Sequence, residues 1–113
     1  MESSDVIKRL SALAQESRLA VFRMLIKAGP EGVAAGEIAR GLDITPNTLS
    51  SQLNILANAD LIASRRAGRS IVYTANYDRM SDLLLYLMDD CCQGRSEVCA
   101  PLAQIAARAA CCG

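Results

Sequence analysis

The stretch from Ile44 to Asn76 reads ITPNTLSSQLNILANADLIASRRAGRSIVYTAN, and it predicts a helix followed at once by a β-hairpin. Thr45 can cap this helix, and Pro46 suits its first turn, where a missing N–H breaks no hydrogen bond. The segments LIASRR (61–66) and SIVYTA (70–75) have the composition of strands and flank a turn at residues 67–69.

Apolar residues at helical spacing predict three further helices before this stretch and one after it. The expected helices are 6–14, a second capped by Ser17 and stopped by Gly29-Pro30, a third over about 35–40 ended by Gly41, and an apolar stripe from Met80 through Cys91 that ends near Gly94. Residues 101–110 could add one more short helix. Four helices, a hairpin and a helix predict a mainly α chain with a β-hairpin wing, the winged helix-turn-helix.

Two faces of the helix that opens at Pro46 carry different chemistry. Its leucines at 49, 53 and 56 lie within about 60° of one another and predict a buried stripe. The opposite face carries hydroxyls and amides but no acid, and such groups bond to base edges and phosphates. A plain solvated surface is the alternative, but arginines in the hairpin can grip phosphates or a minor groove. The candidate DNA-binding residues are Asn47, Thr48, Ser50, Ser51, Gln52, Asn54, Arg65, Arg66 and Arg69.

The charge of the chain is balanced overall but not along its length. Twelve basic residues oppose twelve acidic ones, which argues against a protein that coats nucleic acid through bulk charge. Residues 44–76 hold three arginines against Asp60, a net of +2, whereas residues 77–100 hold five acids against two arginines, a net of −3. The two segments are therefore expected to do different work.

Several short motifs, taken in order, resemble the ArsR/SmtB metalloregulatory repressors. The matching residues are Thr48-Leu49-Ser50-Ser51-Gln52-Leu53, Asp60-Leu61 and Arg66-Ala67-Gly68-Arg69, together with the helix entry LAQESRLAVFRML (13–25). The resemblance covers roughly residues 10–90. It implies a homodimer, joined through the first and last helices, on double-stranded operator DNA with an inverted repeat. An isologous seam would place the two reading heads about 34 Å apart, one DNA turn.

The last predicted helix supports a dimer independently of that resemblance. Its apolar residues, Leu83 to Leu85, Leu87 and Met88, are too many for the core of one small subunit. The alternative is that this helix packs wholly within its own chain. Residues 1–94 are thus expected to form the DNA-binding and dimerisation domain, and residues 95–113 a C-terminal extension with a thiol ligand and a possible short helix.

The stretch DDCCQGRSEVC (89–99) holds three of the five cysteines, and the chain has no histidine. No signal peptide or membrane-length apolar run is present, so we expect a cytoplasmic protein with reduced thiols and no membrane contact. Four of the cysteines form adjacent pairs, which bond to each other only with strain, so a structural disulfide framework is disfavoured.

Thiols alone remain as ligands for a sensed ion, and thiolates favour soft ions. Members of this family that sense arsenic often carry Cys-x-Cys in the third helix, but VAAGEIAR (33–40) has no cysteine. Zinc sites on the last helix need histidine, which is absent. Cys91, Cys92 and Cys99 supply the three sulfurs that As(III) or Sb(III) takes, as in a resembling variant group of arsenic-responsive members.

The expected function is a repressor whose dimer leaves its operator when As(III), or Sb(III), is captured by these three thiols, with no organic cofactor. A disulfide between Cys92 and Cys99 in a redox-sensing repressor, or a sensor of Cd(II) or Pb(II), remains an alternative. An enzyme is disfavoured because neither Cys91 nor Cys92 begins a Cys-x5-Arg loop. Buried filler is the remaining interpretation of the three thiols, and a frayed tail is the first interpretation of Cys111 and Cys112.

Overall fold

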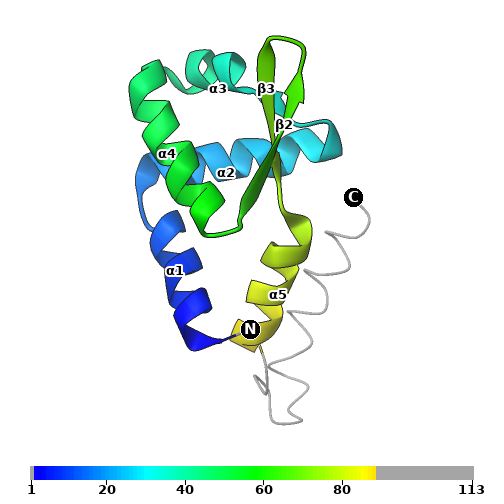
Figure 1. The fold of residues 1–113 in the computed structure, drawn as a ribbon. Helices are drawn as coiled ribbons and strands as arrows, with labels where there is room; N and C mark the ends of the chain where they lie inside the picture. Colours follow the sequence, from blue (N-terminus) through cyan, green and yellow to red (C-terminus); the bar gives the residue numbers. More distant parts are fainter. Residues whose placement is uncertain (1, 89–113) are drawn as a thin grey trace.

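The computed structural model describes residues 2–88, which form the five helices and two hairpin strands of the predicted kinds and two short additions (Figure 1). The elements are α1 (Ser3–Leu13), α2 (Glu16–Ala28), the 3₁₀ turn η1 (Gly29–Glu31), β1 (Val33–Ala34), α3 (Ala35–Leu42), α4 (Pro46–Asn58), β2 (Ile62–Ala67), β3 (Ser70–Ala75) and α5 (Tyr77–Met88). The mainly helical fold with a β-hairpin wing is confirmed. The stripe residue Cys91, the helix end at Gly94 and the extension 95–113 lie outside the described residues.

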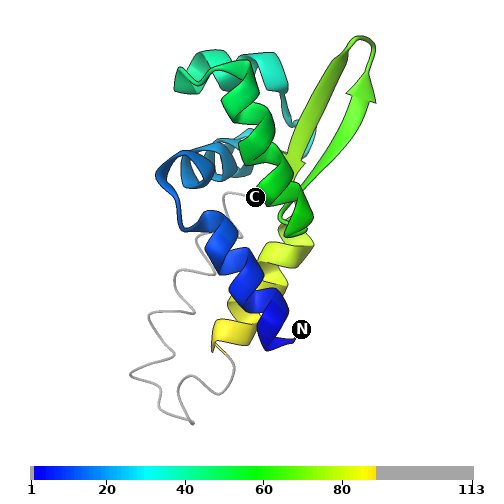
Figure 2. The same ribbon diagram turned by 60° about the vertical axis from the view of Figure 1, so that its left-hand side comes forward.

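The molecule has two ends with different roles. Helix α3, the first turns of α4 and the tip of the hairpin lie together at one end, whereas α1 and α5 extend from the other (Figure 1). Helices α1 and α5 contact each other and converge toward the start of α1 and the end of α5 (Figures 1 and 2). A hydrogen bond of 2.8 Å between the Ser3 Oγ and the Tyr86 hydroxyl joins their ends. Helix α2 crosses between the two ends.

The sheet has three antiparallel strands in the order β1-β3-β2. Strands β2 and β3 pair from Ile62 with Ala75 to Ala67 with Ser70, which leaves a two-residue turn rather than the predicted three. Gly68 takes a φ of +64° in that turn, a conformation that glycine adopts without steric cost. Strand β1 was not predicted, because two residues are too few to show the alternation of a strand.

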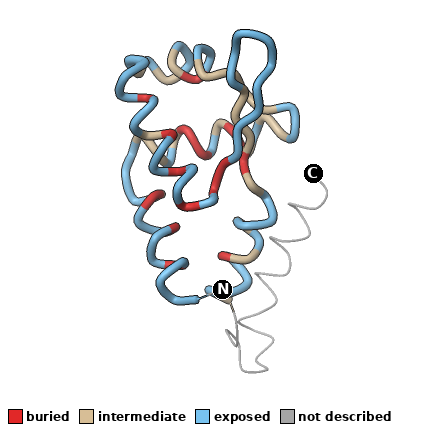
Figure 3. Tube along the Cα trace, viewed as in Figure 1, coloured by how far each residue is buried: buried red, intermediate tan, exposed pale blue. Residues whose placement is uncertain are grey.

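One hydrophobic core joins α2, α3, α4 and the base of the hairpin (Figure 3). All three leucines of α4 are buried, as the helical spacing predicted, with exposed fractions of 2, 3 and 0% for Leu49, Leu53 and Leu56. The side chains of lowest exposure are Val21, Leu25, Ile38, Leu56, Leu61 and Leu83. The core therefore fixes the rotational orientation of α4 about its own axis.

The predicted end of the third helix at Gly41 is wrong. Helix α3 continues to Leu42, and the left-handed residue that terminates it is Asp43, with a φ of +53°. A β-carbon at Gly41 would lie 2.9 Å from the Met24 Cε, the end of a flexible side chain that can move aside. The structure therefore uses Gly41 neither as a helix end nor for a close approach of two backbones.

The start of the second helix also differs from the prediction. Gln15, not Ser17, is the capping residue, and its Oε1 accepts a 2.9 Å hydrogen bond from the Arg18 backbone N–H. Thr45 does occupy the cap position of α4, with Pro46 in the first turn. Its hydroxyl donates to the Thr48 Oγ1 at 2.9 Å rather than accepting from a backbone N–H.

Two glycines that flank η1 have nearly the same backbone conformation but different surroundings. Gly29 and Gly32 have φ values of +80° and +77°. A β-carbon on Gly29 would meet nothing within 4 Å, whereas one on Gly32 would lie 2.5 Å from the Tyr73 carbonyl oxygen. Gly32 therefore permits the backbone of the β1 segment to approach β3.

We expect Gly29→Ala to lower the free energy of unfolding by about 1–3 kcal/mol, because a φ of +80° with a ψ of −166° is a backbone conformation essentially restricted to glycine. Gly32→Ala should lower it by about 3 kcal/mol or more, since the same strain is joined by a backbone clash that forces β1 away from β3. Urea denaturation of both variants tests the difference, and equal losses would contradict the close approach at Gly32.

Candidate nucleic-acid interface

The polar face predicted for α4 points away from the core. Asn47, Thr48, Ser50, Ser51 and Asn54 are exposed, while the leucine stripe of the same helix is buried. This face carries hydroxyl and amide groups without a carboxylate, so it offers donors and acceptors to base edges and no charge that repels phosphate.

Two of the hydroxyls on this face make only local hydrogen bonds. The Ser51 Oγ donates to the Asn47 carbonyl oxygen at 3.4 Å, a long contact. Thr48 accepts from Thr45 through its Oγ1 and therefore keeps its own hydroxyl proton. Both side chains can reorient toward a phosphate oxygen without breaking a contact to the core.

Gln52 differs from the other candidate residues of α4 because it is half-buried. Its Oε1 accepts a hydrogen bond of 3.2 Å from the Arg18 Nη1, which comes from the first turn of α2. The position of this side chain is therefore set by a contact within the protein.

The three hairpin arginines do not share one environment. Arg69 lies in the turn, and Arg66 pairs with Ile71, next to the last pair of the ladder. Arg65 lies further down β2, where its Nη2 donates to the Glu31 carbonyl oxygen at 2.7 Å and its Nη1 to Pro30 at 3.4 Å. The Arg65 guanidinium is thus bound to η1 in this structure, whereas Arg66, the next residue of the strand, points to the opposite face of the sheet.

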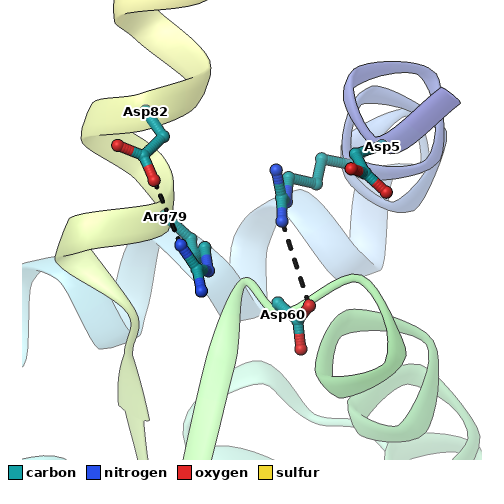
Figure 4. A pocket seen from close by; sticks show the side chains of 5 residues that line it. Asp5, Asp60, Arg79 and Asp82 are labelled. Atoms are coloured by element: carbon teal, nitrogen blue, oxygen red, sulfur yellow. Dashed lines mark hydrogen bonds and ion pairs between the residues drawn. The ribbon is translucent and has the colours of Figure 1, made fainter. Parts of the chain in front are cut away.

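A second polar cluster lies away from this interface, between α1, the end of α4 and α5 (Figure 4). Three aspartates and two arginines line it, and the ion pairs are Arg9 with Asp60 at 3.9 Å and Arg79 with Asp82 at 3.2 Å. The Arg9 Nε also donates to the Ala59 carbonyl oxygen at 3.1 Å. Arg9 is 7% exposed, so α1 holds the C-terminal end of α4 through a buried charged hydrogen bond.

The sequence itself indicates that Arg9 faces the core, although this residue was not among the predicted ones. Arg9 lies three residues after Val6 and three before Ala12, both of which are buried. Helical spacing therefore places this charge on the core-facing stripe of α1. A charge in such a position needs a partner, and the partner comes from a helix distant in sequence.

No candidate metal site lies in the described part of the chain. Among residues 2–88, no three His, Cys, Asp or Glu side chains are grouped so that they could hold a metal ion. The predicted ligands Cys91, Cys92 and Cys99, and the further cysteines Cys111 and Cys112, lie outside this range.

Comparison with known proteins agrees with this geometry. Residues 13–65, from the end of α1 through half of the hairpin, match the helix-turn-helix domain family. The chain is 35% identical over 82 residues to the HTH-type transcriptional regulator NmtR of Mycobacterium tuberculosis. The matched region covers 73% of this chain and 66% of NmtR. It is 32% identical over 65 residues to the transcriptional repressor SdpR of Bacillus subtilis, spanning 58% of this chain and 70% of SdpR.

A solved structure links these sequences to a named family. The homodimeric winged helix-turn-helix DNA-binding domain of Mb0332 from Mycobacterium bovis, described as a possible ArsR-family regulator, superimposes with a TM-score of 0.62. That match has 27% identity and covers 77% of this chain and 81% of the Mb0332 fragment. The chain belongs to the ArsR family of transcriptional regulators. In this ArsR-family protein α4 is the recognition helix and the hairpin is the wing.

These relatives are transcriptional regulators rather than enzymes. Within residues 2–88 of this ArsR-family chain, every helix is too short or too polar to cross a membrane. Among the described residues, Arg66 and Arg69 are the cations nearest the hairpin turn.

Replacing Arg69 by Ala should weaken DNA binding a few-fold and lower the slope of log affinity against log salt by about 0.9, because one phosphate contact is lost. Arg79→Ala is the matched control, since it removes one arginine from α5 at the opposite end of the molecule (Figure 1). Fluorescence anisotropy over a salt series measures both. An unchanged slope for Arg69→Ala would contradict a phosphate contact by the wing.

Proposed function

We propose that this ArsR-family protein is a homodimeric repressor that releases its operator when As(III) is captured by Cys91, Cys92 and Cys99. Sb(III) is the second ion that suits the same three thiols. The observation that carries the repressor geometry is the separation of two sets of exposed side chains. Polar and cationic residues are exposed on α4 and the hairpin, and apolar residues are exposed on α1 and α5, which extend from the other end of the molecule (Figure 1).

The apolar surface on α1 and α5 fits a second copy of the chain. Leu84, Leu85 and Leu87 are 53, 69 and 48% exposed, and only Leu83 of this helix is fully buried. Ile7 and Leu10 of α1, the helix that contacts α5, are 63 and 41% exposed. Exposed apolar side chains gathered on neighbouring helices favour an interaction surface. These exposed leucines support a dimer over packing of α5 wholly within its own subunit.

A two-fold seam on α1 and α5 suits operator binding. An isologous interface pairs the same surface of both subunits, so the two recognition helices face DNA with the symmetry of an inverted repeat. The described homodimeric state of Mb0332 supports this arrangement. Two adjacent major grooves require the reading heads to lie about 34 Å apart.

The thiol site follows from the donor atoms that the sequence offers. The chain has no histidine, and all five cysteines follow Asp90. Cys91 and Cys92 come three and four residues after Met88, the last described residue of α5, and Cys99 follows seven residues later. Three sulfurs satisfy a trivalent, thiophilic ion, and its capture displaces thiol protons.

A path from that site to the DNA runs through the described residues. Any shift of α5 acts on α1, which it contacts, and α1 holds the end of the recognition helix through Arg9 and Ala59. A coupling of about 1–3 kcal/mol between ion and DNA is typical of such regulators and would suffice for release.

Replacing Cys91, Cys92 or Cys99 singly by Ser should leave operator affinity unchanged and abolish release by arsenite, because two thiols cannot complete the site. The double variant Cys111→Ser/Cys112→Ser is the matched control and should respond as the unchanged protein does. Operator-binding titrations with arsenite, antimonite, Cd(II), Zn(II) and peroxide provide the measurement.

Each alternative has its own signature in that titration. Arsenite-driven release that persists in all three single variants would reject the ligand assignment. Release by peroxide alone would favour a redox-sensing repressor with a disulfide between Cys92 and Cys99. Release by Cd(II) alone would favour a sensor of soft divalent ions.

The seam can be tested separately from the ion site. Leu85→Glu should weaken dimerisation by about 100-fold or more, because a carboxylate would be buried without a partner. Ile71→Glu, which adds the same charge to an apolar residue of the wing that is 43% exposed, should leave the dimer intact. Sedimentation velocity measures both, and a fully dimeric Leu85→Glu protein would place the seam elsewhere.

A further inference from the structure

Arg18 is a junction between three segments of the chain. Its Nε donates to the Ala12 carbonyl oxygen at 2.6 Å, and its Nη2 to the Ser11 carbonyl oxygen at 3.4 Å, both at the C-terminal end of α1. Its Nη1 donates to the Gln52 Oε1 on the recognition helix at 3.2 Å. One rigid guanidinium therefore ties the end of α1 to the middle of α4.

The chemistry of this contact fixes the orientation of the Gln52 amide. A guanidinium has five N–H donors and no acceptor, so only the carbonyl oxygen of the amide can face it. The Gln52 Nε2 must then point the other way. Among residues 2–88, no buried side-chain nitrogen or oxygen lacks a hydrogen-bond partner, and Nε2 makes no hydrogen bond within this range. The Nε2 group is therefore not fully buried, and Gln52 lies next to Thr48 around the helix, between the leucine stripe and the polar face of α4.

We propose that Arg18 is a positioning residue for operator recognition, which holds the Gln52 oxygen inward so that Gln52 meets DNA only as a hydrogen-bond donor. This inference rests on the proposed operator binding. The groups that fit are acceptors: a phosphate oxygen, or the N7 or O6 edge of a purine. Bidentate reading of adenine needs both the oxygen and the nitrogen of the amide, so Arg18 excludes it.

Three variants on an operator selected from random-sequence DNA test this assignment. Gln52→Met removes the donor and should weaken binding about tenfold, the effect of losing one good base or phosphate contact. Arg18→Met should weaken it less, because Gln52 keeps its donor but loses its orientation. The double variant should bind like Gln52→Met alone, since Arg18 acts through Gln52. Arg23→Met, which removes an exposed arginine of the same helix, is the control and should bind as the unchanged protein.

A purely structural role of Arg18 gives a different result. Losses that add in the double variant, or a Gln52→Met protein that binds normally, would overturn the inference. Circular dichroism of each variant shows whether it is folded. Arg18→Lys replaces Arg18→Met in the test if the Met variant does not fold. Lys can still bind one α1 carbonyl oxygen, but it lacks the forked guanidinium that also reaches Gln52. It should bind DNA as weakly as Arg18→Met does if folded, and wild-type affinity would contradict the proposal.

Modified operators distinguish the two kinds of acceptor. If Gln52 donates to a phosphate, a neutral methylphosphonate at one position should abolish the difference between wild-type and Gln52→Met. If it donates to a purine, an analogue lacking N7 or O6 should do so instead. If wild-type and Gln52→Met still differ in affinity on every modified operator, Gln52 does not act as a hydrogen-bond donor to DNA. A wild-type protein that binds no selected DNA would instead reject the proposed operator binding.

Discussion

Burial of the leucine stripe on α4 is the constraint on which the rest of the molecule depends. Leu49, Leu53 and Leu56 insert into the core formed by α2, α3 and the base of the hairpin, and each is at most 3% exposed. Burial of one leucine stabilises the fold by roughly 1.5–3 kcal/mol. Rotating the helix about its axis would expose these leucines to water and cost several kcal/mol of that stabilisation. The polar face must therefore turn outward, and DNA recognition follows from hydrophobic packing.

Two arginines add the finer positioning that hydrophobic packing does not supply. Arg9 fixes the C-terminal end of α4 to α1 through the Ala59 carbonyl oxygen, and Arg18 fixes its middle through Gln52. Hydrophobic contacts are non-directional, whereas charged hydrogen bonds specify distance and angle. Both arginines connect the recognition helix to the segment beside the proposed seam, so a change at the seam has a mechanical route to the DNA-reading surface.

The elements were predictable because their signals are local. Periodic leucines, Pro46 at a helix start and a glycine turn between strand-like segments each act within a few residues. A glycine near the end of a helical pattern does not fix where the helix ends. Gly41 was predicted to end the third helix, yet the residue with the left-handed conformation is Asp43. The contacts of Arg65 were not predictable either, because the carbonyl groups that it binds lie 34 and 35 residues earlier in the chain.

The sequence by itself determined the class of fold, the polar face of the recognition helix and the restriction of soft-ion ligands to the cysteines after Asp90, because composition and periodicity are properties of the chain alone. Only the tertiary structure decided which polar groups stay available to a partner. Gln52 and Arg65 make hydrogen bonds to residues distant in sequence. Arg9 is buried, although helical spacing by itself shows only a charge on the apolar side of a helix and no partner for it. Hydrogen bonds between residues far apart in sequence leave no local pattern, so folding has to bring the partners together before their roles can be assigned.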